Sequence, residues 1–307
     1  KIGKASGGAI LKSFQHTIAR PLSFSGIGLH TGVDAEARIL PAPPDTGIVF
    51  RRTDTGTEIP ALVDHVAETA YATVLAIDNV RISTVEHFLA ALYGMEIDNA
   101  VIEVSGPELP ILDGSALAVS RAIADCGSVR QEVRRRILRI MENDRIRENG
   151  SMVAVSPAAE MEILVMVDFP ASAIGRQWAK FLLTPENFLK EIAPARTFVL
   201  RHQIDALRAA GLAKGGSLDN AIVVEGDRIH NAEGLRFSNE FARHKLLDFL
   251  GDISLLGRPV RGSFLSVRPG HTVNRIVTEF LASSWYSAVH GSPVSPGKIP
   301  VDIQVTA

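Results

Sequence analysis

His244 and Asp248 lie four residues apart in the run Ser238–Asp252, and this spacing constrains the chain more than any other feature. On an α-helix, at about 100° per residue, both side chains project from one narrow stripe of the surface. Lys245 and Asp252 lie within about 100° of that stripe, and the apolar residues of the run face the opposite side, as expected for a helix packed on a core. The run therefore predicts an amphipathic helix with two potential metal ligands one turn apart.

The polar stripe of this helix also has a simpler explanation. Most amphipathic helices only expose such a face to solvent, and this is the commoner case. Solvated faces are usually rich in Lys and Glu, whereas this stripe combines a His with carboxylates. From this segment alone, metal binding by His244 and Asp248 stays one of two open alternatives.

A second segment resembles the first. The pattern His-x-Leu, with a Gly five residues after the Leu, begins at His87 and again at His244, and strand-like runs follow at 99–104 and 262–267. The chain therefore predicts two related helix-then-strand halves. If the halves face each other, His87, His244 and Asp248 meet. Three such ligands with a fourth position open are typical of catalytic zinc, whereas structural zinc sites are closed by four ligands.

Glu86 precedes the first His and has two explanations. The run from Ser83 to Glu86 matches a capping box, in which both side chains bond free backbone N–H groups at a helix start. Alternatively, a carboxylate beside a metal-binding His acts as general base toward a water molecule activated by the metal. The spacing by itself favours the cap.

Composition excludes several classes of function. The net charge of −2 comes without a basic block, so nothing indicates nucleic-acid binding, and no apolar run approaches the ~18 residues of a membrane span. Cys126 is the only cysteine, which excludes an intramolecular disulfide and a cysteine-rich metal site. The first residues lack the apolar segment of a secretory signal. We expect a globular enzyme, because a hydrophobic content of 46% is ordinary for that class, and the single cysteine fits a reducing cytoplasm.

The length of the chain and the position of its turn-forming residues predict two α+β domains, residues 1–128 and 129–307. The polar, basic stretch 127–136 is expected to be the linker. The stretch 197–224 predicts an apolar strand, a helix, a Gly-rich turn and a strand, with apolar residues that are core by default. One helix is expected to begin at about residue 84, and another is expected to end at about residue 124. Further helices are expected at 185–192, 202–210 and 238–252. Strands are expected near 99–104, 137–141, 152–156, 161–168, 221–224 and 262–267.

His271 follows the strand expected at 262–267. A lone His after a Gly is usually an ordinary loop residue. This one lies beyond the strand that follows the helix carrying His244, so it comes close enough to face a metal there. A protonated imidazole in that place donates a proton to a leaving amine.

Several unusual runs occur along essentially the whole chain. They are Phe24–Gly32, Ser83–His87, Leu109–Ala116, Ala195–Phe198, Gly215–Ser217, Gly234–Phe237, Arg243–Asp248 with Gly251–Asp252, and Gly270–His271. In this order and at these intervals they resemble the UDP-3-O-acyl-N-acetylglucosamine deacetylase family. The resemblance implies a cytoplasmic zinc amidase of Gram-negative bacteria that removes acetate from UDP-3-O-(3-hydroxyacyl)-N-acetylglucosamine, the committed step of lipid A synthesis. It also implies two similar α+β domains, each a sheet packed by two helices, facing each other with the active site between them.

Residue by residue, the resemblance assigns Zn²⁺ to His87, His244 and Asp248. Glu86 becomes the general base, and His271 becomes the general acid. These are the residues that the repeat, the helical spacing and the position after the strand also single out.

The same resemblance assigns supporting roles. Thr197 stabilises the oxyanion together with the zinc ion. Lys245 supplies positive charge near the reacting centre, and Asp252 orients His271. Burial of the acyl chain in the stretch 197–224 supplies about 0.8 kcal/mol per CH₂. The residues assigned to the acyl-chain passage are Phe198, Leu200, Ile204, Leu207 and Leu212, and those assigned to the uridine diphosphate are Phe169 and Arg268.

Two positions depart from the family pattern. Ala72 stands where some members have a cysteine that reaches the metal, and the pair Ala213 and Lys214 is more polar than usual at the mouth of the passage. The second departure leaves the preferred acyl length open. Two other classes of function stay open as well, a zinc hydrolase for another amide and a non-catalytic binding protein. We expect a small-molecule substrate, no nucleic acid and no obligate protein partner.

Overall fold

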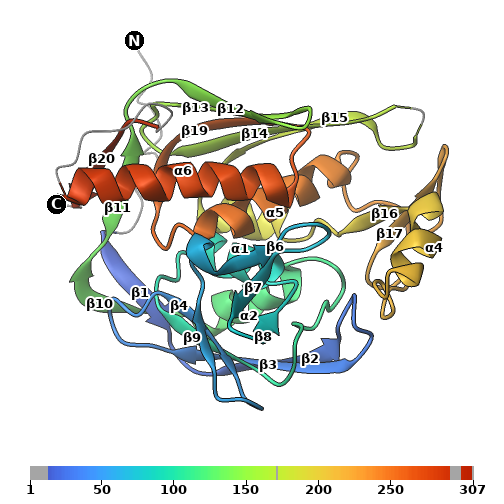
Figure 1. Cartoon of the computed structure of the whole chain (residues 1–307), viewed down its shortest axis with the longest axis horizontal. Coiled ribbons are helices and arrows are strands. Elements are labelled where there is room, and N and C mark those ends of the chain that lie inside the picture. Colours follow the sequence, from blue (N-terminus) through green and yellow to red (C-terminus); the bar gives the residue numbers. More distant parts are fainter. Residues whose placement is uncertain (1–12, 171, 291–298, 306–307) are drawn as a thin grey trace, which may run out of the picture.

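The computed structural model describes residues 13–170, 172–290 and 299–305, so the N-terminal residues considered above lie outside the described part. Helices and strands are mixed along the chain, which confirms the expected α+β class. Figure 1 shows two larger sheets with helices between them. In the described part, no helix is both long and apolar enough to span a membrane.

The first sheet contains five strands from the first half of the chain. β9 lies at its centre, parallel to β4 and antiparallel to β3, while β2 and β5 form the two edges. The order across the sheet is β2 (Leu22–Ile27), β3 (Asp34–Pro41), β9 (Ala100–Val104), β4 (Ile48–Arg52) and β5 (Glu58–Pro60).

The second sheet repeats this arrangement. β19 is parallel to β14 and antiparallel to β13, and β12 and β15 pair with the outer sides of those strands. The order is β12 (Asp144–Glu148), β13 (Ser151–Ser156), β19 (Val260–Val267), β14 (Met161–Phe169) and β15 (Gly175–Leu182), and β11 (Arg136–Ile140) and β20 (Val301–Val305) extend the sheet from β19. Strand order and direction match the first sheet one for one, which confirms the predicted repeat.

Each central strand lies between two helices in the chain. α1 (Glu86–Gly94) precedes β9 and α2 (Leu117–Cys126) follows it, as α5 (Glu240–Ser254) precedes β19 and α6 (His271–His290) follows it. The core lies between the helices and the inner faces of the sheets, to which strands such as β3 and β14 contribute alternate residues. Large side chains fully buried in this core include Phe50, Phe88, Phe241, Phe249 and Phe264.

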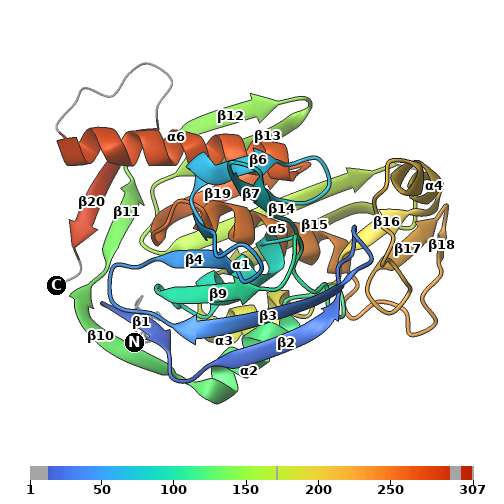
Figure 2. The ribbon, with the colours of Figure 1, turned by 60° about the horizontal axis from the view of Figure 1, so that its bottom comes forward.

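A smaller unit is inserted at the same point in each half, between the edge strand and the first helix. The first insert comprises η1 (Val63–His65), β6 (Val66–Glu68), β7 (Val74–Ile77) and β8 (Val80–Ile82). The second comprises α3 (Pro185–Asn187), the π-helical turn η2 (Phe188–Ile192), β16 (Phe198–Leu200), α4 (Arg201–Ala209), β17 (Ile222–Glu225) and β18 (Arg228–Ile229). Its α4 and β16–β18 lie at one end of the molecule in both views (Figures 1 and 2).

Two elements were not expected from the sequence. The stretch 127–136, expected as a linker, contains the strand β10 (Ser128–Arg134), which pairs antiparallel with β1 (Phe14–Ile18). Its inward residue is polar: Gln131 donates to the Ala42 carbonyl (2.8 Å) and accepts from Asn99 (2.7 Å), so the strand lacks an apolar alternation. His271 begins α6, a helix that the sequence did not indicate.

The other expected elements are confirmed, with ends shifted by a few residues. The helix expected at 185–192 is divided into a short α-helical turn and a π-helical turn. The boundary between domains 1–128 and 129–307 stays a prediction.

Candidate metal centre

α1 and α5 pack against each other where the two halves meet, and this contact positions the site. A Cβ added to Gly251 of α5 would collide with the backbone of Glu86 at the start of α1, so only glycine permits this approach of the helices. The approach brings His87 of α1 next to His244 of α5, with ring centroids 5.2 Å apart. The Gly shared by both segments of the repeat thus has a packing role in α5.

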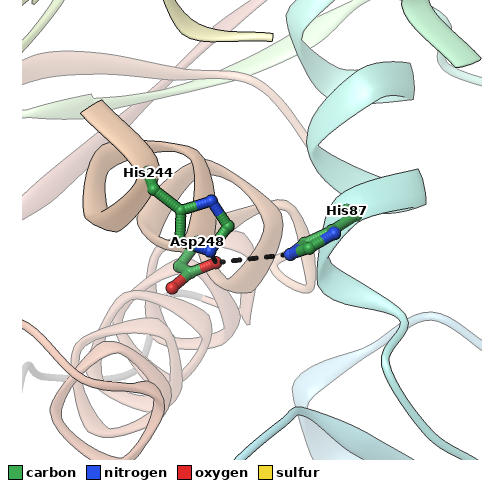
Figure 3. A group of neighbouring side chains, drawn as sticks. All are labelled: His87, His244 and Asp248. Carbon is green, nitrogen blue, oxygen red and sulfur yellow. Dashed lines mark ion pairs between the residues drawn. The ribbon is translucent and has the colours of Figure 1, made fainter. Parts of the chain in front are cut away.

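His87, His244 and Asp248 form one buried cluster. The candidate ligand atoms all lie within 4.8 Å of one another, and the exposed fractions of the three residues, in that order, are 6%, 1% and 3%. Asp248 Oδ1 is 3.3 Å from His244 Nε2 and 3.8 Å from His87 Nε2. Figure 3 shows His244 and Asp248 pointing from one helix toward His87 on the other.

The cluster fits a zinc ion. Ligand atoms about 2.1 Å from a tetrahedral zinc ion lie roughly 3.4 Å apart, close to the separations from Asp248 Oδ1. His244 Nδ1 is 3.1 Å from the Ala195 carbonyl, which can only accept, so the ring carries its hydrogen there and directs the Nε2 lone pair toward the cluster. One carboxylate and two imidazoles are ligands typical of catalytic zinc.

The electrostatics of the cluster favour metal-binding protonation states. Burial, with the neighbouring His244, lowers the pKa of His87 to about 3, and burial also lowers the pKa of His244. Burial opposes ionisation of Asp248, but His244 and Lys245 outweigh it and hold the pKa of Asp248 below its usual value. Neutral imidazoles and an ionised carboxylate are the forms that bind a metal.

Glu86 does not form the capping box. Residue 85 is the N-cap of α1 and has no side-chain cap in the described structure, while the Ser83 hydroxyl donates to the Pro107 carbonyl (3.3 Å). Glu86 is 3% exposed, and its Oε2 accepts from the backbone N–H of Thr73 (3.1 Å). Burial raises the pKa of Glu86 to about 7, assisted by the charges of Asp248 and Asp252. A carboxyl group with such a pKa exchanges protons near neutral pH.

The turn into α1 is strained. Thr84 has a φ of 59°, a left-handed conformation that a β-branched residue rarely adopts. Its hydroxyl donates to Glu108 Oε1 (2.9 Å), and the buried Glu108 also accepts from the backbone N–H groups of His30 and Thr31. These bonds offset the strain and fix the direction in which α1 begins.

His271 lies at the start of α6, beside a buried carboxylate. Its Nδ1 is 2.8 Å from Asp252 Oδ2, which also accepts from Asn274 (2.9 Å). Burial alone lowers the pKa of His271, but Asp252 outweighs it, by charge and by hydrogen bonding, and the pKa rises to about 9. The imidazole therefore stays protonated at neutral pH, with its Nε2 free of this contact.

Lys245 and Thr197 lie beside the cluster. Lys245 Nζ donates to Asp248 Oδ2 (2.7 Å), and this ion pair raises the pKa of Lys245 against the effect of burial. Thr197 follows the buried Arg196, whose Nε donates a hydrogen bond to Glu240 Oε1 of α5 (2.9 Å). The segment carrying Thr197 is thereby anchored to the helix that supplies two of the three clustered residues.

The cluster opens into a cavity of about 470 Å³. Glu86, His271, Thr197 and Lys245 contribute to its wall with the three clustered residues, and on the side of the second insert so do Phe198, Ile204 and Leu207. Of the remaining assigned residues, Leu200 and Leu212 belong to the same unit but not to this wall. Their role stays a prediction.

Phe169 and Arg268 also lie outside the cavity wall. Phe169 makes an edge contact with Phe198, with ring centroids 5.8 Å apart. Arg268 is exposed and donates to Asp168 Oδ2 (3.1 Å), next to Phe169 in sequence. Both therefore lie near the cavity, and their contact with substrate stays a prediction.

The structure adds two residues that sequence reasoning did not assign. Thr73, 1% exposed, contacts Glu86, Asp252 and His271. His30 lies in the cavity wall, and neither ring nitrogen has a hydrogen-bond partner among the described residues. Burial lowers the pKa of His30. For His30 the only signal was its place in the run Phe24–Gly32.

Known proteins are similar to this chain over most of its length. The family model described as UDP-3-O-acyl N-acetylglycosamine deacetylase matches residues 15–283. Proteins named UDP-3-O-acyl-N-acetylglucosamine deacetylase from Anaeromyxobacter sp. (strain Fw109-5) and Phenylobacterium zucineum (strain HLK1) are 45% and 42% identical to the chain, covering 87% and 88% of it and 88% and 94% of their own lengths. One from Brucella melitensis biotype 2 is 42% identical over 89% of the chain and 96% of its own length. The chain therefore belongs to the UDP-3-O-acyl N-acetylglycosamine deacetylase family.

Proposed function

We propose that this protein is a zinc-dependent amidase that hydrolyses the acetamide of UDP-3-O-[(3R)-3-hydroxyacyl]-N-acetylglucosamine in the cytoplasm, as the committed step of lipid A synthesis. The products are acetate and the free glucosamine amine. The observation that carries the proposal is the buried group His87, His244 and Asp248, which opens into a cavity with Glu86 and His271 in its wall. Membership of a deacetylase family supports the choice of reaction.

His87, His244 and Asp248 hold the zinc ion. Zinc at this position supplies Lewis acidity and lowers the pKa of a water molecule toward neutrality. His244 keeps its Nε2 lone pair available because its Nδ1 donates to the Ala195 carbonyl. Lys245 balances the charge of Asp248 and adds positive charge beside the reacting acetamide.

Glu86 and His271 divide the proton transfers between them. The carboxylate of Glu86, whose pKa is about 7, accepts a proton from the attacking water. His271 is protonated at the start, with a pKa of about 9, and donates from Nε2 to the departing nitrogen. Asp252 holds the other ring nitrogen and so fixes the orientation of the imidazole. Thr197 donates to the oxygen on which negative charge develops.

The acyl chain occupies the side of the cavity formed by the second insert. Phe198, Ile204 and Leu207 offer apolar surface there, and each buried CH₂ contributes about 0.8 kcal/mol to affinity. A substrate that lacks the chain loses this contribution. Discrimination against simple N-acetyl sugars follows from this loss.

The test is acetate release by the zinc-loaded protein from the acylated nucleotide sugar, compared with N-acetylglucosamine. We expect rapid release from the first and very little from the second. Glu86→Ala and His271→Ala should each lower turnover by about 10²- to 10⁴-fold while zinc content stays unchanged. Equal rates on both substrates, or near wild-type turnover in either variant, would contradict the proposal.

A further inference from the structure

Thr73 is buried between the groups assigned to acid and base catalysis. It lies just before β7 in the first insert and is 1% exposed. Its backbone N–H donates to Glu86 Oε2 (3.1 Å). Its hydroxyl donates to Asp252 Oδ1 (2.6 Å) and lies 3.2 Å from His271 Nδ1. One residue thus bonds groups from α1, α5 and α6.

The hydroxyl of Thr73 supplies the hydrogen bond to the second oxygen of the buried Asp252 carboxylate. Asp252 Oδ2 bonds His271 and Asn274, and the opposite oxygen, Oδ1, accepts from Thr73. Bonds on both oxygens fix the carboxylate plane. The plane in turn determines where the His271 ring points, because a short charge-assisted bond joins the two groups.

Thr73 does not belong to the cavity wall, although Glu86 and His271 do. Substrate bound in the cavity therefore meets the groups that Thr73 holds rather than Thr73 itself. Loss of its hydroxyl should alter the chemical step more than substrate binding.

We propose that Thr73 is a positioning residue that fixes Glu86 and the Asp252–His271 pair relative to each other. The proposal rests on the proposed function, because it assumes that these groups transfer protons. Its backbone bond sets the place of the carboxylate on α1, and its hydroxyl sets the orientation of the imidazole on α6. The first insert thereby joins the two halves at the reacting centre.

Thr73→Val tests the hydroxyl, because it keeps the branched shape and the backbone N–H. Thr73→Ser restores the hydroxyl. Thr17→Val is the matched control, since Thr17 is also buried and its hydroxyl accepts from the Ala42 N–H (3.0 Å), outside the site. In the zinc-loaded enzyme we expect Thr73→Val to lower kcat by about 10- to 100-fold with KM within about twofold. Thr73→Ser and Thr17→Val should retain most of kcat.

A second readout does not depend on activity. The proton between His271 Nδ1 and Asp252 should give a low-field NMR signal in wild type and Thr73→Ser, and the signal should shift or vanish in Thr73→Val. Wild-type kcat together with an unchanged signal in Thr73→Val would overturn the proposal, as would failure of Thr73→Ser to restore kcat. Absence of acetate release by wild type would instead refute the proposed function, and the NMR signal would still test Thr73.

Discussion

Glu86 and His271 are both buried, and their pKa values rise for different reasons. Burial raises the pKa of Glu86 to about 7 by disfavouring its charge. Burial opposes the charge of His271, but Asp252 reverses the effect and raises the pKa of His271 to about 9. One group is thus ready to accept a proton in the pH range in which the other still carries one.

This pair predicts a bell-shaped pH profile for kcat/KM. Activity falls below pH of about 7 as Glu86 becomes protonated, and it falls above pH of about 9 as His271 loses its proton. Asp252→Asn removes the charge that raises the pKa of His271, so the basic limb should move to lower pH while the acidic limb stays. Rates measured from pH 5 to 10 check this, and an unmoved basic limb would contradict the role of Asp252.

At the residue scale, the sequence predicted the contacts that are local. His244 and Asp248 are one helical turn apart, so periodicity alone places them together. Thr73 could not be found in this way, because its partners Glu86, Asp252 and His271 are 13, 179 and 198 residues distant. The capping box was wrong because the Ser83 hydroxyl donates to a carbonyl of a distant loop.

At the scale of elements, the contact of α1 with α5 determines the geometry of the site. Gly251→Ala should push the helices apart, because its new methyl group would meet the backbone of Glu86. We expect a loss of about 1–3 kcal/mol in the free energy of unfolding and weaker zinc binding. Chemical denaturation and zinc titration measure both effects.

Gly94→Ala is the matched control for this substitution. Its methyl group would meet the ring of Phe188, which is fully buried, so stability should fall similarly. Phe188 lies outside the wall of the cavity, and zinc affinity should change little. Equal losses of zinc affinity in the two variants would mean that the Gly251 contact has no specific role in the site.

The sequence predicted the helices α1 to α5 and the strands β9, β11, β13, β14, β16, β17 and β19, but it did not predict α6 or β10. α6 has a buried stripe at Val273, Val277, Leu281 and Trp285, spaced by four residues, directly after Pro269 and Gly270, which locally favour a turn. β10 was missed because Gln131, not an apolar residue, faces inward. Both errors arise where local signals conflict with tertiary contacts.

At the scale of the whole molecule, the two sheets have the same strand order, and the ligand set is divided between the halves. His87 comes from the first half, and His244 and Asp248 come from the second. The sequence indicated two helix-then-strand halves, but strand order depends on pairings distant along the chain, which periodicity does not encode. A ligand bound by both halves should stabilise the native chain.

Zinc should therefore raise the apparent free energy of unfolding, by about 4 kcal/mol when free zinc is about 1,000 times Kd. His87→Ala leaves ligands from α5 alone, so the gain should largely disappear. Denaturation with and without a chelator measures the difference. An equal gain in wild type and His87→Ala would indicate that zinc binds elsewhere.

We predict that one metal ion is bound jointly by the two halves. An anomalous difference map at the zinc absorption edge, from crystals of the zinc-loaded protein, tests it directly. We predict a single strong peak within bonding distance of His87 Nε2, His244 Nε2 and an Asp248 oxygen. A map without a peak there, or with zinc bound only by other residues, would show that the two halves do not share a zinc ion.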